Sequence, residues 1–159
     1  MKKLLLVEKF FIKEELIKIK NLIENTNFKI SDLGEESDIN YTIINPDKVF
    51  SEYLDGHYRI IQERSGIFRK PIHTIHFETF ETSDDWCFFV ALKPTTFNLF
   101  YHNTGAESVL DEHKLNYADF TEWNYTTNIL LEENQGLFFR PWLFHSIQGG
   151  LTQHYHITK

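Results

Sequence analysis

Cysteine is almost absent from this sequence, and so are clusters of positive charge. The single cysteine, Cys87, cannot form an internal disulfide, so the fold does not depend on an oxidising compartment. It sits in the apolar run WCFFVAL (86–92), where a buried, unreactive thiol is expected. Lysines and arginines do not cluster beyond the Lys-rich start, and the net charge is −7. Both observations argue against nucleic acid as a partner, because phosphate binding requires grouped cations.

Long hydrophobic runs are also missing. No stretch of about 18 apolar residues occurs, so we expect no membrane partner. The apolar run LLLV (4–7) is shorter than the roughly 7–15 residues of a signal peptide, which favours a cytoplasmic protein. The sequence has no internal repeat or linker, and its 159 residues predict one domain over residues 1–159.

The first third of the chain contains the expected helical support, over residues 12–56. Residues 3–12 are apolar and predict a first strand. Apolar residues such as Leu16, Ile19 and Ile23 then recur at helical spacing, which predicts a helix from about 12 to 25. The segment 47–56 follows a proline, ends in glycine and favours a second short helix. We expect these helices to pack on the outer face of a β body.

From residue 57 to about residue 157 the pattern changes to short strands separated by turns. The expected strands are HYRIIQER, PIHTIHFETF, WCFFVALK, FNLFYHN, TNILLEE, GLFFRPWLFHSI and TQHYHITK. Many short strands without alternating helices predict a β-sandwich or a β-barrel. Gly149 and Gly150 favour a tight hairpin between the last two strands. An exposed edge strand would favour a homodimer.

Three residues form a candidate metal site. On a strand, residues two apart point the same way, so His76 and Glu78 should share one face. His145 lies near a strand end in a later apolar run and is a third candidate ligand. Two histidines and one carboxylate on one side of an ion are typical of non-haem Fe(II) oxygenases. The structural alternative is a hydrogen-bonded His76–Glu78 pair that holds no metal.

Other polar residues have structural interpretations. Arg140 interrupts an apolar run, but an odd separation from His145 points it to the opposite face of a regular strand, which favours a solvated edge or a structural salt bridge. His154 and His156 share a face and are expected as half-exposed imidazoles. His73 should point away from His76. The three tryptophans are expected in packing positions.

The order of these motifs resembles the 2-oxoglutarate/Fe(II)-dependent dioxygenase superfamily, in particular its small prolyl-hydroxylase-like members of phage and marine bacteria. The matching pieces are HFE (76–78), FFVALKP (88–94), FNLFYHNTG (97–105) and NQGLFFRPWLFHSI (134–147). The resemblance covers about residues 57–157. It implies a double-stranded β-helix, the jelly-roll fold that cupins share. It also implies that His76, Glu78 and His145 hold Fe(II) with 2-oxoglutarate as co-substrate, and that the reaction is hydroxylation of a small molecule, amino acid or peptide.

Three departures from the family pattern leave alternatives open. The family usually has Asp where Glu78 stands. An Arg or Lys usually follows the distal histidine by eight to ten residues, to pair with the far carboxylate of 2-oxoglutarate, but positions 153–155 are Gln, His and Tyr. Lys93 stands where an Asn is expected, and would serve as the carboxylate anchor with Tyr101 as a second donor. The alternatives are a cupin-type metalloprotein that does not use 2-oxoglutarate and a non-catalytic binding or assembly protein.

Overall fold

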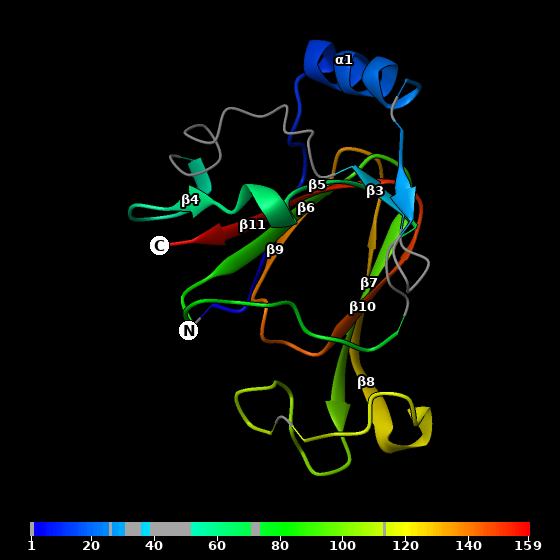
Figure 1. Cartoon of the computed structure of the whole chain (residues 1–159). Helices are drawn as coiled ribbons and strands as arrows, with labels where there is room; N and C mark the ends of the chain where they lie inside the picture. Colours follow the sequence, from blue (N-terminus) through cyan, green and yellow to red (C-terminus); the bar gives the residue numbers. More distant parts are fainter. Residues whose placement is uncertain (1, 26, 31–35, 39–51, 71–73, 113) are drawn as a thin grey trace.

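A computed structural model describes residues 2–25, 27–30, 36–38, 52–70, 74–112 and 114–159 (Figure 1). The elements in chain order are β1 (Leu4–Val7), α1 (Lys13–Ile23), β2 (Lys29–Ile30), β3 (Glu36–Asp38), β4 (Arg59–Ile60), η1 (Gln62–Arg64), β5 (Gly66–Lys70), β6 (Trp86–Ala91), β7 (Thr95–His102), η2 (Phe120–Glu122), β8 (Trp123–Leu131), β9 (Gly136–Phe139), β10 (His145–Gly149) and β11 (Thr152–Thr158). The protein is therefore mainly β, with one α-helix among the described residues.

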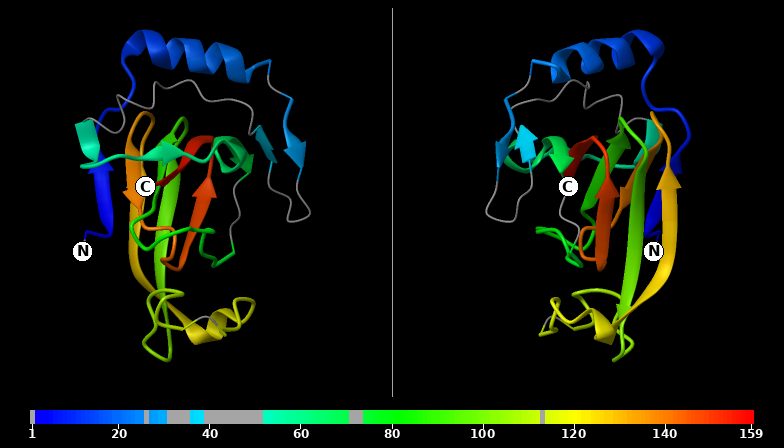
Figure 2. Two further views of the ribbon diagram at one scale, coloured as in Figure 1. Left: turned by 60° about the vertical axis from the view of Figure 1, so that its left-hand side comes forward. Right: turned by 90° about the vertical axis from the view of Figure 1, so that its right-hand side faces the viewer.

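The strands form two antiparallel sheets. The larger has eight strands in the order β1-β9-β6-β11-β5-β3-β2, with β4 also paired to β11. The smaller has three strands in the order β10-β7-β8. Strands β1 to β6 all belong to the larger sheet, and after β6 the chain crosses between the two sheets at β6–β7, β8–β9, β9–β10 and β10–β11 (Figures 1 and 2).

The central strand β6 is buried on both faces, which explains its uninterrupted apolar sequence. One face, through Phe88, packs with α1 residue Ile19 and with Phe138 in a first core cluster. The other face, through Phe89, packs toward the smaller sheet in a second cluster with Phe97. The helix thus covers the outer face of the larger sheet, as the sequence predicts, and Figure 2 shows it at one end of the molecule.

The sequence predicts most elements correctly. The helix expected at 12–25 is α1, and the strands expected at 86–93, 97–103, 127–133 and 152–159 are β6, β7, β8 and β11. The first strand is shorter than expected, because only residues 4–7 pair with β9. The first half of the second expected helix (47–56), residues 47–51, lies outside the described residues, as do His73 and His113. All three tryptophans are buried.

The hairpin expected at Gly149–Gly150 is wrong. β10 pairs with β7 in the smaller sheet, whereas β11 pairs with β5 and β6 in the larger one. Gly149 has a φ of 99°, and a Cβ there would lie 2.9 Å from the Pro94 carbonyl oxygen. Glycine is therefore required where the chain turns sharply from one sheet to the other, rather than back along the same sheet.

The segment expected as a single strand at 136–147 forms two strands, β9 and β10, separated by residues 140–144. Arg140, the first residue of this connection, has a structural role. Its buried guanidinium lies 3.7 Å from the centre of the Trp86 ring. It donates hydrogen bonds to the carbonyl oxygens of Lys2, Asp84 and Asp85. This buried network replaces the solvated edge or salt bridge expected from the sequence.

Among the described residues, no helix combines the length and the apolar character that crossing a bilayer requires.

We predict that Arg140→Met lowers the free energy of unfolding by about 2–4 kcal/mol, because three carbonyl groups lose a charged donor that is itself buried. Urea unfolding measures the loss. The control is Arg59→Met, which removes an exposed ion pair with Glu81 and should cost less than about 1 kcal/mol. Equal losses in the two variants would contradict a structural role for Arg140.

Candidate metal centre

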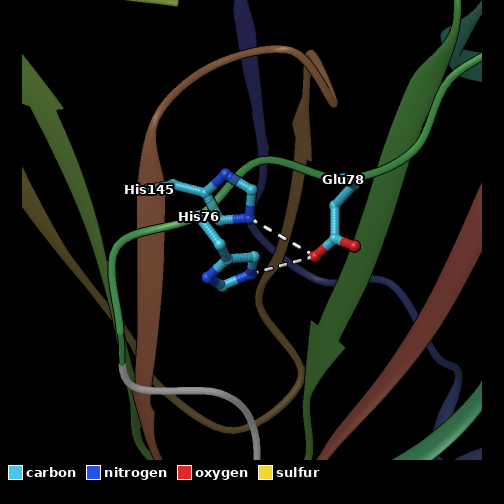
Figure 3. A group of neighbouring side chains, drawn as sticks. All are labelled: His76, Glu78 and His145. Carbon is cyan, nitrogen blue, oxygen red and sulfur yellow. Dashed lines mark hydrogen bonds and ion pairs between the residues drawn. The ribbon is translucent and has the colours of Figure 1, made fainter. Parts of the chain in front are cut away.

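His76, Glu78 and His145 converge, as the sequence predicts, although not on a full strand. The segment expected as a strand at 71–80 forms only one antiparallel bridge in its described part, between His76 and His145. Two backbone hydrogen bonds of 2.9 Å make this bridge, and the Glu78 amide donates to the Pro141 carbonyl at 2.8 Å. These contacts bring the three side chains together beside β10, along the edge that does not pair with β7 (Figure 3).

The distances between the three side chains suit a shared ion. Oε1 of Glu78 lies 3.2 Å from Nε2 of His76 and 3.5 Å from Nε2 of His145. One ligand atom from each residue lies within 4.8 Å of the other two, so the group could hold a metal ion. Neighbouring ligands about 2.1 Å from one ion are separated by roughly 3–3.5 Å, which matches both distances.

Each histidine is oriented by its second ring nitrogen. Nδ1 of His76 lies 2.7 Å from the Thr74 carbonyl oxygen, and Nδ1 of His145 lies 2.8 Å from that of Leu143. A carbonyl oxygen only accepts, so each Nδ1 carries a proton and each Nε2 is directed toward Glu78, with Nε2 of His76 within hydrogen-bond distance of Oε1. Metal-binding histidines are commonly fixed in this way.

The buried Nε2 atom of His145 has no hydrogen-bond partner of good geometry among the described residues. Buried polar nitrogens are almost always satisfied, so this atom requires an explanation. In the neutral ring its lone pair faces a carboxylate oxygen, which is also an acceptor. A cation between these atoms resolves the conflict, so the donor set fits a metal ion with nitrogen and oxygen ligands.

The protonation states also suit metal binding. Burial raises the pKa of the Glu78 carboxyl, but interactions with His145 and His76 overcome this effect and hold the pKa well below its ordinary value. Burial and the neighbouring His76 lower the pKa of His145. Glu78 is therefore a carboxylate and His145 a neutral imidazole, the forms in which these groups bind metals.

The centre is packed on one side and open on the other. His145 is fully buried, with Phe97 stacked on its ring and the edge contact of Phe139 on another side. The side chains of His76 and Glu78 are 19% and 25% exposed to solvent. A pocket of about 240 Å³, lined by Ile75, His76, Phe77 and Tyr117, opens beside His76. A ligand therefore has access to the centre from the His76–Glu78 side.

The structure does not bring Lys93 or Tyr101 to this centre. Leu99 is the residue of β7 opposite His145, and Lys93 lies six positions away along the chain, exposed in the turn before β7. Six strand positions correspond to roughly 20 Å. Tyr101 is 38% exposed, because a bulge between Leu99 and Phe100 changes which side chains of β7 face inward. The spacing argument did not account for either feature.

His154 and His156 are buried, not half-exposed as the sequence suggested. In the β11–β6 register they lie opposite Phe89 and Cys87, so they face the interior between the sheets. The His156 Nδ1 atom lies 3.5 Å from Sγ of Cys87. The alternation of side chains along β11 predicts that both histidines face the same way. Their burial follows from the position of β11 in the middle of the larger sheet, which the sequence does not show.

Burial lowers the pKa of His154 to about 3, so this imidazole is neutral in the folded protein under ordinary conditions. The unfolded chain binds the proton below about pH 6.5. Between these two pH values the unfolded state binds more protons, so stability falls as the pH decreases. From pH 7.5 to pH 5, His154 alone should cost about 2 kcal/mol at roughly 1.4 kcal/mol per pH unit.

We therefore predict that His154→Gln reduces the difference in unfolding free energy between pH 7.5 and pH 5 by about 2 kcal/mol. Urea titrations at both pH values, with a chelator present, measure this difference. His57→Gln alters an exposed histidine and should leave it unchanged. A His154→Gln variant with the full wild-type pH dependence would show that His154 is not buried as a neutral group.

No protein-family model matches this chain, and no curated protein matches it either.

Proposed function

We propose that this protein is a non-haem Fe(II)- and 2-oxoglutarate-dependent oxygenase. The observation that carries the proposal is the convergence of Nε2 of His76, Nε2 of His145 and Oε1 of Glu78, with both Nδ1 atoms held by carbonyl oxygens. Two imidazoles and one carboxylate on one side of an ion leave the opposite positions for other ligands.

The strand order supports a double-stranded β-helix for this proposal. From β5 onward, β5, β6, β9 and β11 belong to the larger sheet, and β7, β8 and β10 to the smaller one. The His76 segment joins the smaller sheet through its bridge to β10. Apart from β7 and β8, which are neighbours in one sheet, successive segments from β5 onward belong to different sheets, and this alternation supports the proposed jelly-roll winding.

Fe(II) bound with 2-oxoglutarate and O₂ supplies oxidising power for hydroxylation of a C–H bond. The residues of this chain hold and orient that chemistry. His76, Glu78 and His145 provide the metal ligands, and the Phe97 and Phe139 rings exclude water from the buried side of His145. The substrate, a small molecule, amino acid or peptide, would approach beside His76, where the pocket opens.

A second candidate is a cupin-type metalloprotein that binds the ion without 2-oxoglutarate. The observation in its favour is the inward face of β11, the strand on which the resembled family usually carries a cation. That face presents Thr152, His154, His156 and Thr158, and both histidines are neutral because burial lowers their pKa values.

We predict that the purified protein, titrated with Fe(II) without oxygen, binds one equivalent, and that 2-oxoglutarate then produces a weak metal-to-ligand charge-transfer band in the visible. His145→Ala should abolish the band and weaken metal binding at least about tenfold, because one of three ligands is lost. Visible absorption and a competitive chelator assay measure the two effects.

His102→Ala is the matched control, since His102 is also a buried histidine beside a carboxylate, that of Glu122. It should bind iron and give the band as the wild type does. Iron binding without a band would favour the cupin-type metalloprotein. No binding of Fe(II), Co(II) or Zn(II) by the wild-type protein would refute both candidates and leave a binding or assembly protein.

A further inference from the structure

The pocket beside His76 has an aromatic and largely uncharged wall. It has a volume of about 240 Å³ and is lined by Ile75, His76, Phe77 and Tyr117. Among the described residues of this lining, none apart from His76 can carry a charge near neutral pH. Pockets for whole drug-sized ligands usually measure about 300–1,000 Å³, so this one suits a single ring or side chain of a larger molecule.

Neighbouring rings hold Tyr117 in place. Its ring is stacked on that of Trp123, with ring centres 5.6 Å apart, and meets the edge of the Phe144 ring at 5.8 Å. Trp123 is anchored in turn, because its indole nitrogen donates to the Asn116 carbonyl oxygen at 3.0 Å. The orientation of Tyr117 is therefore fixed before a ligand enters, and a preformed wall loses little entropy on binding.

The hydroxyl of Tyr117 has no partner among the described residues. Its Oη atom is buried and makes no hydrogen bond with any of them. Burial raises the pKa of this hydroxyl, so it stays protonated near neutral pH and can both donate and accept a hydrogen bond. Buried polar atoms are nearly always satisfied, and a polar group bound in the pocket that Tyr117 lines would satisfy this one.

The pocket and the metal centre share one short segment of chain. Ile75 and Phe77 alternate along it with His76 and Glu78, and His76 belongs to both sites. Side chains that alternate on an extended backbone point in opposite directions. A group bound in the pocket therefore lies beside the metal ligands and not on the ion. This position suits the part of a substrate that is held in place while another part reacts.

We propose that this pocket binds an uncharged aromatic ring that carries one hydrogen-bonding group, and that Tyr117 determines its specificity. Two aromatic side chains in the wall favour an aromatic over an aliphatic ring, because aromatic pairs gain energy beyond that of buried area. The wall disfavours an ionised ligand, which would lose its hydration without compensation. The ring is the non-reacting part of the substrate, and only this last assignment rests on the proposed function.

The first test uses metal-free protein in EDTA, titrated with benzamide and followed by amide chemical shifts. Benzamide should bind saturably and shift the amide signals of residues 75–78 and 115–118. Benzoate and benzamidinium have nearly the same shape but carry a charge, and each should bind at least about fivefold more weakly because it is desolvated. Cyclohexanecarboxamide, which has the same amide on an aliphatic ring, should bind about two- to tenfold more weakly.

Tyr117→Phe keeps the ring and removes only the hydroxyl. It should weaken benzamide binding about two- to tenfold and leave the binding of toluene, which forms no hydrogen bond, unchanged. Tyr125→Phe is the matched control, because Tyr125 is an exposed tyrosine of β8, and it should bind benzamide as the wild type does. The thermal midpoint of Tyr117→Phe should not fall, since a hydroxyl without a partner contributes little to stability.

The proposal is overturned if benzamide does not bind saturably, or if benzoate, benzamidinium or cyclohexanecarboxamide binds as tightly as benzamide. It is also overturned if Tyr117→Phe binds benzamide as tightly as the wild type. A lower thermal midpoint for Tyr117→Phe would contradict it as well, since the hydroxyl would then have a structural partner.

A last titration adds benzamide to the Co(II)-loaded protein and follows the visible ligand-field bands of the metal. A shift of these bands places the ring beside the metal centre, as the assignment to the substrate requires. Unchanged bands would overturn that assignment. The titrations of metal-free protein do not depend on the ion, so their failure is distinguishable from failure of the oxygenase proposal.

Discussion

Two backbone hydrogen bonds join His76 to His145, and they bring together the segments that carry the three side chains of the candidate metal centre. They place two imidazoles side by side, with ring centres 4.4 Å apart, although the residues are 69 positions apart in the chain. Glu78 follows two residues later on the same segment, where its backbone amide donates a hydrogen bond to the Pro141 carbonyl oxygen. Because the bridge is a backbone interaction, the geometry of the centre is built before any ion binds. The ion would then stabilise an arrangement that otherwise leaves Nε2 of His145 without a hydrogen-bond partner among the described residues.

Local sequence patterns predict much of this arrangement. The period of α1 and the apolar run of β6 are properties of short segments, and they predict these two elements correctly. The same holds for the shared direction of His76 and Glu78, which depends only on an extended backbone. The prediction that His145 is their partner rests on its place in a late strand and on the resemblance of the surrounding motif. No local rule specifies which strand lies beside which.

The sequence-based predictions are wrong where the conformation or exposure of a residue depends on its tertiary contacts. Gly149 and Gly150 have the composition of a hairpin, but the turn joins different sheets, because β11 finds its partners in β5 and β6. The bulge in β7 turns Tyr101 outward, and no sequence pattern places that bulge.

The position of β11 has a consequence for how the protein is made. This strand lies in the interior of the larger sheet and pairs with β4, β5 and β6, segments that the ribosome releases long before residues 152–158. Until β11 emerges, β5 and β6 lack a shared neighbour and present open backbone edges, a state prone to association with other chains. High contact order of this kind also slows folding. The larger sheet is therefore completed only after β11 has been synthesised.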